Sequence, residues 1–566
     1  MGAVCATRVC PQGSLRAART LSAVVALTSA LLATPSLDLH AATTLPIEGG
    51  PGLGFQVPWH HIGPEQLLIL VNIDDWQSVQ VADEYMARYA IPAANRLDLT
   101  LNESAVMKSD VYEPLYDEIS DFLRNRPDLE AIAITWTEPW KVSPPENNAG
   151  MSITSAVTFG FHPEYYNSGD GTCAMTEVSP LYGQDLSSPF ADFGLRPAVM
   201  IAGKNAQNAI DVIDRGIAAK SSFPLATGYL MRTTDVFRSI RYGQMEDAVA
   251  FWDHPFGLQL DYRDNSEGHP QDNYVRDADD VLYYFTGLAK VDYLDTLRFL
   301  PGAVADHLTS SGGALTTTSQ MSILRWLEAG ATGSYGTVTE PCSTTDKFAN
   351  VDMLMQRYFS GATLLDAYWQ SVRMPGEGIF VGDPLAQPWA PKARVNASGQ
   401  VELITTGMLD YHIYKVTGVN DGVSTVLLNG VNVHAPQLRV LTVPAGFKTY
   451  KLIDTGKTWV DHGAPLLTDD SITSLRMPDG ASRFQVRASD PQNNDVYYSF
   501  QLASGELLEQ SEDFSAELLP DGTRSLVEIV SRSSTPTDLT IMAFDKWGSE
   551  SQITARITKG SFDILP

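Results

Sequence analysis

The residues best suited to chemistry gather in one turn, VADHLTSSGG, from Val304 to Gly313. The turn follows an apolar run of strand length and offers His307 as a base and Ser310 as a hydroxyl nucleophile. An imidazole that takes the proton of a hydroxyl or thiol is the basis of acyl-transfer catalysis. Because neighbouring strand residues alternate faces, His307 shares a side with Thr309 and lies opposite Ser310. Two interpretations stay open: a residual triad-like site with Asp306, and a buried, hydrogen-bonded strand histidine.

A second candidate nucleophile is Cys342, in TVTEPCSTTDK. A reactive thiolate needs a cationic or histidine-paired setting, and this segment offers Lys347 and no histidine. Cys5 and Cys10 lie in the N-terminal segment, so the remaining pair is Cys173 and Cys342. In an oxidising compartment these two form one disulfide or stay as free thiols. The backbone N–H groups of residues 311–313 are candidates to bind an anion or a carbonyl oxygen.

Oxygen ligands suggest calcium rather than a transition metal. The sequence has no His-Glu-x-x-His motif and no cysteine cluster. The stretch DYRDNSEGHPQDN, Asp261 to Asn273, is interpreted either as a Ca²⁺ site or as a solvated loop. Near the end of the chain, four oxygen-bearing residues could gather at one end of a β-module, and we list them as weak Ca²⁺ ligands: Asp490, Asn494, Asp495 and Asp545. No other cofactor is expected.

The elements that position these residues follow an α/β pattern between residues 66 and 392. Apolar runs of strand length alternate with segments of helical periodicity, which predicts a mostly parallel sheet flanked by helices. The runs DDVLYYFTG and GAVADHLTS are expected as consecutive strands, and SQMSILRWLEAG as a helix. In such sheets functional residues sit at the carboxyl ends of the strands, which is where the turn 304–313 lies.

The two ends of the chain differ from this central part. Arginines precede the apolar run LSAVVALTSALLA, and small residues follow, so we expect a signal peptide over residues 1–41, cleaved near Ala41, and a secreted or periplasmic protein. Residues 42–65 are rich in Pro and Gly and are interpreted as a linker. Beyond 392, short alternating strands predict a β-rich module at 393–465 and a β-sandwich at 466–566.

Composition limits the partners. The chain has 566 residues, 44% hydrophobic and 19% charged, so most of it folds, and its formal net charge is −28. Such an acidic chain argues against nucleic acid and against anionic membrane surfaces, and no membrane span is expected. A polypeptide or a surface partner remains.

The order of motifs from about 67 to 389 resembles the gingipain-like cysteine peptidases, which have the caspase-like fold. The motifs are ITWTEPW, LEAGATGSYG, SGATLLDAYWQSV and FVGDPL. These peptidases carry a histidine in a Gly-His-Gly turn after one strand and a cysteine in the turn after the next. Here the first turn is TGLAK, with Leu288 at the histidine position, and the second is TSSGG, with Ser310 or Ser311 at the cysteine position. The resemblance therefore implies the fold, with both members of the dyad missing.

Two further resemblances concern other segments. The segments LRWLEAGATGSYGTVTEPC and SVQVADEYMARYAIP are similar to an uncharacterised family of exported bacterial proteins. The last hundred residues resemble cadherin-like and Ig-like modules. Two functions follow: a non-catalytic caspase-like binding protein, or a secreted hydrolase that uses a non-standard site around His307, Ser310 and Cys342.

Overall fold

The computed structural model describes the chain from residue 43 onward, with gaps. The residues outside the description are 1–42, 58–60, 102–103, 168–174, 185, 253–257, 407–411, 421–422, 433–437, 444–445, 459–464, 469–470, 477–481, 490–495, 503–513, 519–525, 533, 546–549, 559–560 and 566. Within the described ranges, no helix has the length and hydropathy needed to cross a bilayer.

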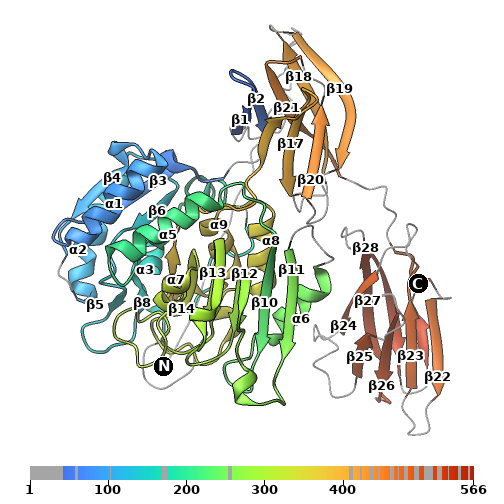
Figure 1. Cartoon of the computed structure of the whole chain (residues 1–566). Coiled ribbons are helices and arrows are strands. Elements are labelled where there is room, and N and C mark those ends of the chain that lie inside the picture. The colour runs from blue at the N-terminus through green and yellow to red at the C-terminus, as the bar shows by residue number, and fades with distance from the viewer. Residues whose placement is uncertain are drawn as a thin grey trace, which may run out of the picture. The chain divides into compact units, whose positions relative to one another are not determined.

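A ten-stranded sheet forms the centre of the α/β part (Figure 1). Its order is β11 (Leu258–Asp264), β10 (Ala226–Arg232), β12 (Ala278–Thr286), β13 (Leu297–His307), β14 (Gly333–Thr337), β15 (Gly378–Gly382), β9 (Ala198–Met200), β6 (Ala131–Ile134), β3 (Leu67–Asn72) and β4 (Arg96–Leu99). Every neighbouring pair is parallel except β14 and β15, which are antiparallel. The mostly parallel α/β sheet expected from the sequence is confirmed at this level.

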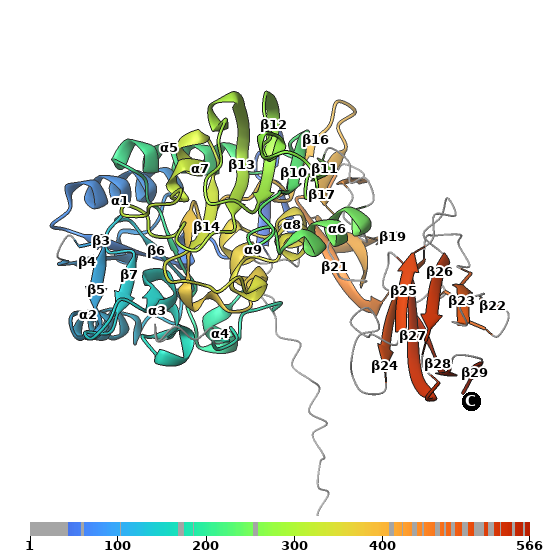
Figure 2. The same cartoon turned by 90° about the horizontal axis from the view of Figure 1, so that it is seen from below.

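Helices cover both faces of this sheet, as Figure 2 shows for α1, α5 and α7 on one side and α3, α8 and α9 on the other. The described helices are α1 (Trp76–Tyr89), α2 (Ser109–Leu123), α3 (Ile153–Phe159), α4 (Pro189–Phe193), α5 (Ala206–Ala219), α6 (Tyr242–Phe251), α7 (Leu324–Ala329), α8 (Val351–Phe359) and α9 (Leu364–Ser371). Because both faces are covered, the central strands are apolar along their length rather than alternating. In β12 the last six residues are all buried.

One helix beside the candidate turn starts later than the sequence predicts. The helix expected over 319–330 begins only at Leu324, because Met321 N–H donates to Ala289 O and Ile323 N–H donates to Gly312 O, at 2.9 Å each. These bonds hold residues 319–323 as a loop against the turn.

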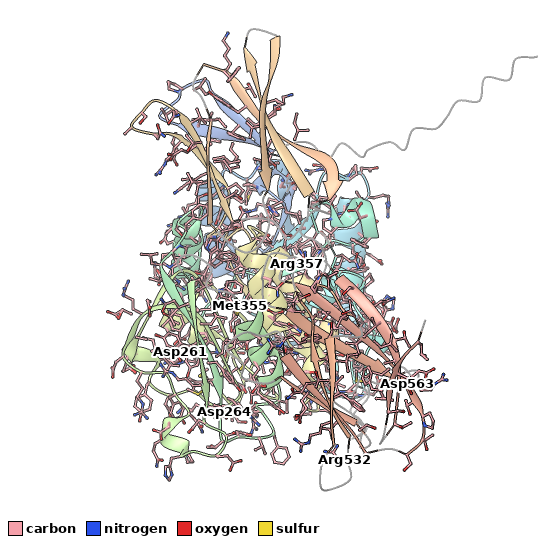
Figure 3. The ribbon with its side chains drawn as sticks, turned by 90° about the vertical axis from the view of Figure 1, so that its right-hand side faces the viewer. Asp261, Asp264, Met355, Arg357, Arg532 and Asp563 are labelled. Atoms are coloured by element: carbon pink, nitrogen blue, oxygen red, sulfur yellow. The ribbon has the colours of Figure 1, made fainter. Side chains whose placement is uncertain are left out.

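The oxygen-rich stretch at 261–273 begins inside the edge strand β11, where Asp261 and Asp264 (labelled in Figure 3) form ion pairs with Arg263 and Arg232.

Residues 42–65, expected to be a linker, contain two strands. A turn over residues 49–53 joins β1 (Thr43–Glu48) to β2 (Gly54–Val57), so the Gly and Pro residues at 49–52 belong to a hairpin. The hairpin lies inside an eight-stranded sheet of the order β19 (Val423–Asn432), β18 (His412–Asn420), β21 (Thr449–Thr458), β2, β1, β16 (Lys392–Val395), β17 (Val401–Thr406) and β20 (Leu438–Val443). The module that follows residue 392 is therefore completed by strands from the other end of the chain.

The C-terminal residues form two antiparallel four-stranded sheets. One contains β22 (Ile472–Arg476), β23 (Ser482–Arg487), β26 (Leu526–Ser531) and β25 (Phe514–Leu518). The other contains β24 (Val496–Leu502), β27 (Thr537–Asp545), β28 (Glu550–Ile557) and β29 (Phe562–Ile564). Phe484 of the first sheet and Ile541 of the second belong to one buried apolar cluster. A small sheet of β5 (Val106–Lys108), β7 (Lys141–Ser143) and β8 (Met151–Ser152) accompanies the α/β part.

Candidate functional site

The carboxyl ends of β12 and β13 lie side by side. Thr286 is the register partner of His307, and Leu308 N–H donates to Thr286 O at 3.0 Å. The loops that follow, which start at Gly287 and Leu308, therefore adjoin. A Cβ on Gly287 would lie 2.0 Å from the backbone oxygen of Arg238, so this glycine is required for close packing of the loop that follows β10. Leu288 is only 7% exposed and belongs to the core.

His307 is completely buried and both of its ring nitrogens are engaged. Trp326 Nε1–H donates to Nδ1 at 2.9 Å, so Nδ1 is the acceptor, and Nε2 carries the proton and donates to Met321 O at 3.1 Å. An indole nitrogen only donates, which assigns this tautomer. Burial, with a smaller contribution from the positive charges of Arg241 and Arg238, lowers the pKa of His307 to about 3. The ring is neutral near pH 7 and has no free lone pair for a substrate proton.

Asp306, next to His307, faces a different partner. Its carboxylate forms an ion pair with Arg241, and each side chain is 1% exposed. Arg241 also donates to Ala349 O at 3.2 Å and to Thr286 O at 3.4 Å. Burial raises the pKa of Asp306 and the guanidinium opposes that shift. Asp306 thus stabilises the core behind the turn.

Ser310 and its neighbours form a turn that is closed by hydrogen bonds within the chain. Ser310 is half-buried, and its carbonyl accepts from Thr337 Oγ1 at 3.2 Å. Among the described residues, no imidazole is hydrogen-bonded to the Ser310 hydroxyl. Gly313 N–H donates to Thr337 O at 2.9 Å, and Ser311 N–H donates to the side-chain oxygen of Gln320 at 2.9 Å. These two N–H groups of the expected anion site are thus already paired.

Cys342 is half-buried and disulfide-bonded, so it carries no thiolate. Its expected partner, Cys173, lies outside the described residues, and that pairing stays a prediction.

The calcium ligands expected near the C-terminus fall largely outside the description. Asp490, Asn494 and Asp495 are in the gap at 490–495, and the side chain of Asp545 is also not described. The backbone of Asp545 ends β27, opposite Val496 of β24. In the described part of the chain, no three His, Cys, Asp or Glu residues are placed to hold a metal ion.

A cleft of about 760 Å³ opens beside the turn. Its walls come from the segments after β12 and β13: Lys290, Val291, Asp292, Tyr293, Leu294, Asp295, Leu315, Thr316, Thr318, Ser319, Gln320, Met321, Ser322 and Arg325. The sequence analysis did not single out Gln320 or Trp326, the residues that occupy the donors of the turn and the acceptor of His307. Only the hydroxyl-rich composition of 316–322 hints at a polar surface there.

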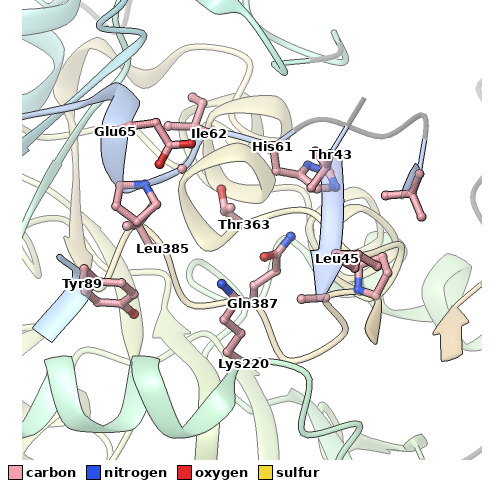
Figure 4. Close-up of a pocket in the computed structure, with 15 residues that line it drawn as sticks. Thr43, Leu45, His61, Ile62, Glu65, Tyr89, Lys220, Thr363, Leu385 and Gln387 are labelled. Atoms are coloured by element: carbon pink, nitrogen blue, oxygen red, sulfur yellow. The ribbon is translucent and has the colours of Figure 1, made fainter. Parts of the chain in front are cut away.

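Another cavity, of about 310 Å³, lies between β1, residues 61–65 and the segment after β15 (Figure 4). His61 pairs with Asp366 there at 3.5 Å, and the Asp366 carboxylate also completes the capping of α9. Its lining is structural, and none of the nucleophile candidates belongs to it.

Comparison with known proteins gives little likeness. No family model matches the chain, and no curated protein matches it. Twelve chains of solved structures match it. One, described as "Structure of Protease", has 9% sequence identity and a TM-score of 0.33, over 88% of this chain and 98% of its own length. A TM-score this low carries no argument about fold or activity.

Proposed function

We propose that the chain is an exported, non-catalytic protein of the caspase-like type that binds a polypeptide in the cleft beside the β12 and β13 loops. The engaged imidazole of His307 carries this proposal. A general base needs a free acceptor nitrogen within reach of the nucleophile. Here Nδ1 is used by Trp326 and Nε2–H by Met321 O. The positions of the catalytic histidine and cysteine in the peptidases that this chain resembles are taken here by Leu288 and Ser310. This also supports a non-catalytic protein.

The cleft supports the binding half of the proposal. Its walls alternate buried apolar residues, such as Leu294 and Met321, with exposed charged residues, such as Lys290 and Asp292. Such a mixture suits an extended polypeptide, which presents amides and side chains of both kinds. We further propose that a Cys173–Cys342 disulfide and the C-terminal modules, as Ig-like sandwiches, stabilise and space this domain outside the cell.

The proposed absence of catalysis is tested with broad peptide and ester substrate libraries. The wild-type chain is compared with Ser310→Ala and His307→Ala, and we expect no turnover from any of them. Turnover by the wild type that Ser310→Ala, the variant expected to keep its stability, abolishes would instead establish the alternative, a secreted hydrolase.

The binding half is tested with a displayed peptide library. Selected peptides are synthesised and their Kd values compared between the wild type and Ser319→Trp, which narrows the cleft. Ser398→Trp, in the exposed turn between β16 and β17, is the matched control. We expect a loss of at least tenfold for Ser319→Trp only, about 1.4 kcal/mol. Equal affinities for all three chains would remove the cleft as the site.

A further inference from the structure

One oxygen beside the cleft accepts an unusual number of hydrogen bonds. Gln320 Oε1 accepts from Ser311 N–H at 2.9 Å, from Thr309 Oγ1–H at 2.9 Å and from Ser311 Oγ–H at 3.0 Å. We call these three donors the donor set. Thr318 Oγ1 lies 3.0 Å from Ser311 Oγ and completes the arrangement by donating to it. All of these residues lie within 309–320, which the structure describes without a gap.

This donor set is better matched to an anionic oxygen than to an amide oxygen. A neutral amide oxygen offers two lone pairs to these three donors, whereas a carboxylate offers two oxygens with about four acceptor sites and makes stronger, charge-assisted bonds. Behind Thr309, Arg238 Nε–H donates to the Thr309 hydroxyl at 3.2 Å, which strengthens that hydroxyl as a donor. Arg238 is itself held by Asp235 at 2.7 Å, so the guanidinium is fixed and partly neutralised. The turn thus directs three donors at one oxygen, and the guanidinium of Arg238 lies behind one of them.

We propose that the donor set is a carboxylate site that the chain fills with its own Gln320 side chain. This inference rests on the proposed function and deepens it, because the ligand is then a polypeptide that presents a carboxylate. Gln320 and Thr318 both line the cleft, so a ligand in the cleft meets the amide directly. The backbone beside Gln320 is held by a bond outside this arrangement, since Met321 N–H donates to Ala289 O at 2.9 Å. The side chain can therefore leave while the loop stays in place.

The Gln320 side chain competes with any ligand for the donor set and so lowers the affinity that is measured. A ligand must first expel the Gln320 amide, so the measured Kd equals the intrinsic Kd divided by the fraction of molecules in which the donors are free. Removing the amide should therefore create affinity rather than destroy it.

Chemical rescue tests the donor set without any polypeptide. In Gln320→Ala the removed group is replaced from solution by acetate or by acetamide, which have the same shape and differ in charge. We expect acetate to raise the melting temperature of Gln320→Ala about twice as much as acetamide, with no such difference in the wild type. Gln356→Ala, which removes a glutamine that bonds Asp352 on α8, is the matched control and should respond to neither compound selectively. Equal rescue by the two compounds, or a selective effect in the wild type, would overturn the carboxylate site.

Gln320→Glu keeps the question answerable if Gln320→Ala fails to fold. A permanent carboxylate in the donor set should raise the melting temperature at pH 7 above that of the wild type, and a lower value contradicts the inference.

Three peptides then distinguish a C-terminal carboxylate from a side-chain carboxylate as the ligand: acetyl-Ala-Ala-Ala with a free carboxyl, its amide, and acetyl-Ala-Glu-Ala-amide. We expect Gln320→Ala to bind one or both acidic peptides at least tenfold more tightly than the neutral amide. Successful rescue without such peptide discrimination would leave the carboxylate site standing and reject the polypeptide ligand.

Discussion

The indole Nε1–H of Trp326 lies 2.9 Å from Nδ1 of His307 and donates to it inside the core of the α/β part. This contact assigns the tautomer of the only imidazole in the candidate turn and directs its remaining N–H to a backbone carbonyl, Met321 O. A histidine held in this way joins β13 to the loop and helix that follow it. His307 is thus a structural residue in the position where the sequence alone admits a base.

Replacing His307 by Ala should therefore reduce stability. The substitution leaves a cavity and strands the Trp326 N–H and the Met321 carbonyl without partners, which costs about 3–5 kcal/mol of the free energy of unfolding. Urea denaturation followed by tryptophan fluorescence measures the change. Ser310→Ala, on the half-buried turn, should change it by less than about 0.5 kcal/mol. Comparable losses for the two variants would contradict the assigned role of His307.

The buried pair of Arg241 and Asp306 should behave as a coupled unit. Arg241→Met or Asp306→Leu alone leaves one charge buried without its partner, which costs about 3–5 kcal/mol. The double variant removes both charges, so its cost should fall short of the sum of the two single costs by at least about 1 kcal/mol. Unfolding free energies of the four chains give the coupling. Strict additivity would mean that the two side chains act independently.

Asp383 should make the folded state less stable as the pH rises. Its carboxyl accepts from Tyr85 OH at 2.9 Å and from Tyr89 OH at 2.6 Å, and burial raises its pKa from 3.8 to about 6. Between these two values the folded state keeps a proton that the unfolded chain releases. Stability therefore falls as pH rises through this window, by up to about 1.4 kcal/mol per pH unit.

Asp383→Asn removes this titration, and the difference in unfolding free energy between the two chains isolates it. His307 has a lowered pKa and acts in the opposite direction, since acidification protonates the unfolded chain first. It is present in both chains and cancels in the difference. A difference that stays constant from pH 4 to about 6.5 would show that Asp383 is not protonated in this range.

The hairpin of β1 and β2 should be necessary for the eight-stranded sheet. Phe55 on β2 is fully buried and packs against Tyr450 with ring centroids 5.8 Å apart, and the hairpin as a whole lies between β21 and β16. Phe55→Ala should cost about 3–5 kcal/mol and open the strands β16–β21 to protease. Gln56→Ala, whose side chain points to the other face, is the control. Limited proteolysis distinguishes the two, and equal resistance would show that the hairpin is dispensable.

Local patterns in the sequence were enough to predict the α/β alternation and the apolar strands β12 and β13. Strand and helix periodicity depend on residues a few positions apart, so a single sequence carries them. The same patterns located the turn at 304–313. The resemblance to the gingipain-like peptidases, rather than periodicity, implies that Leu288 in the neighbouring loop takes the position of their histidine.

Tertiary structure alone decided what the turn's groups bind. Trp326 reaches His307, Gln320 folds back on Ser311, and a hairpin at residues 43–57 enters a sheet with residues 392–458. None of these partners is marked by periodicity, because each hydrogen bond depends on which segments the folded chain brings together. The chemistry of a buried donor or acceptor is set by that partner, and residue type alone leaves it open.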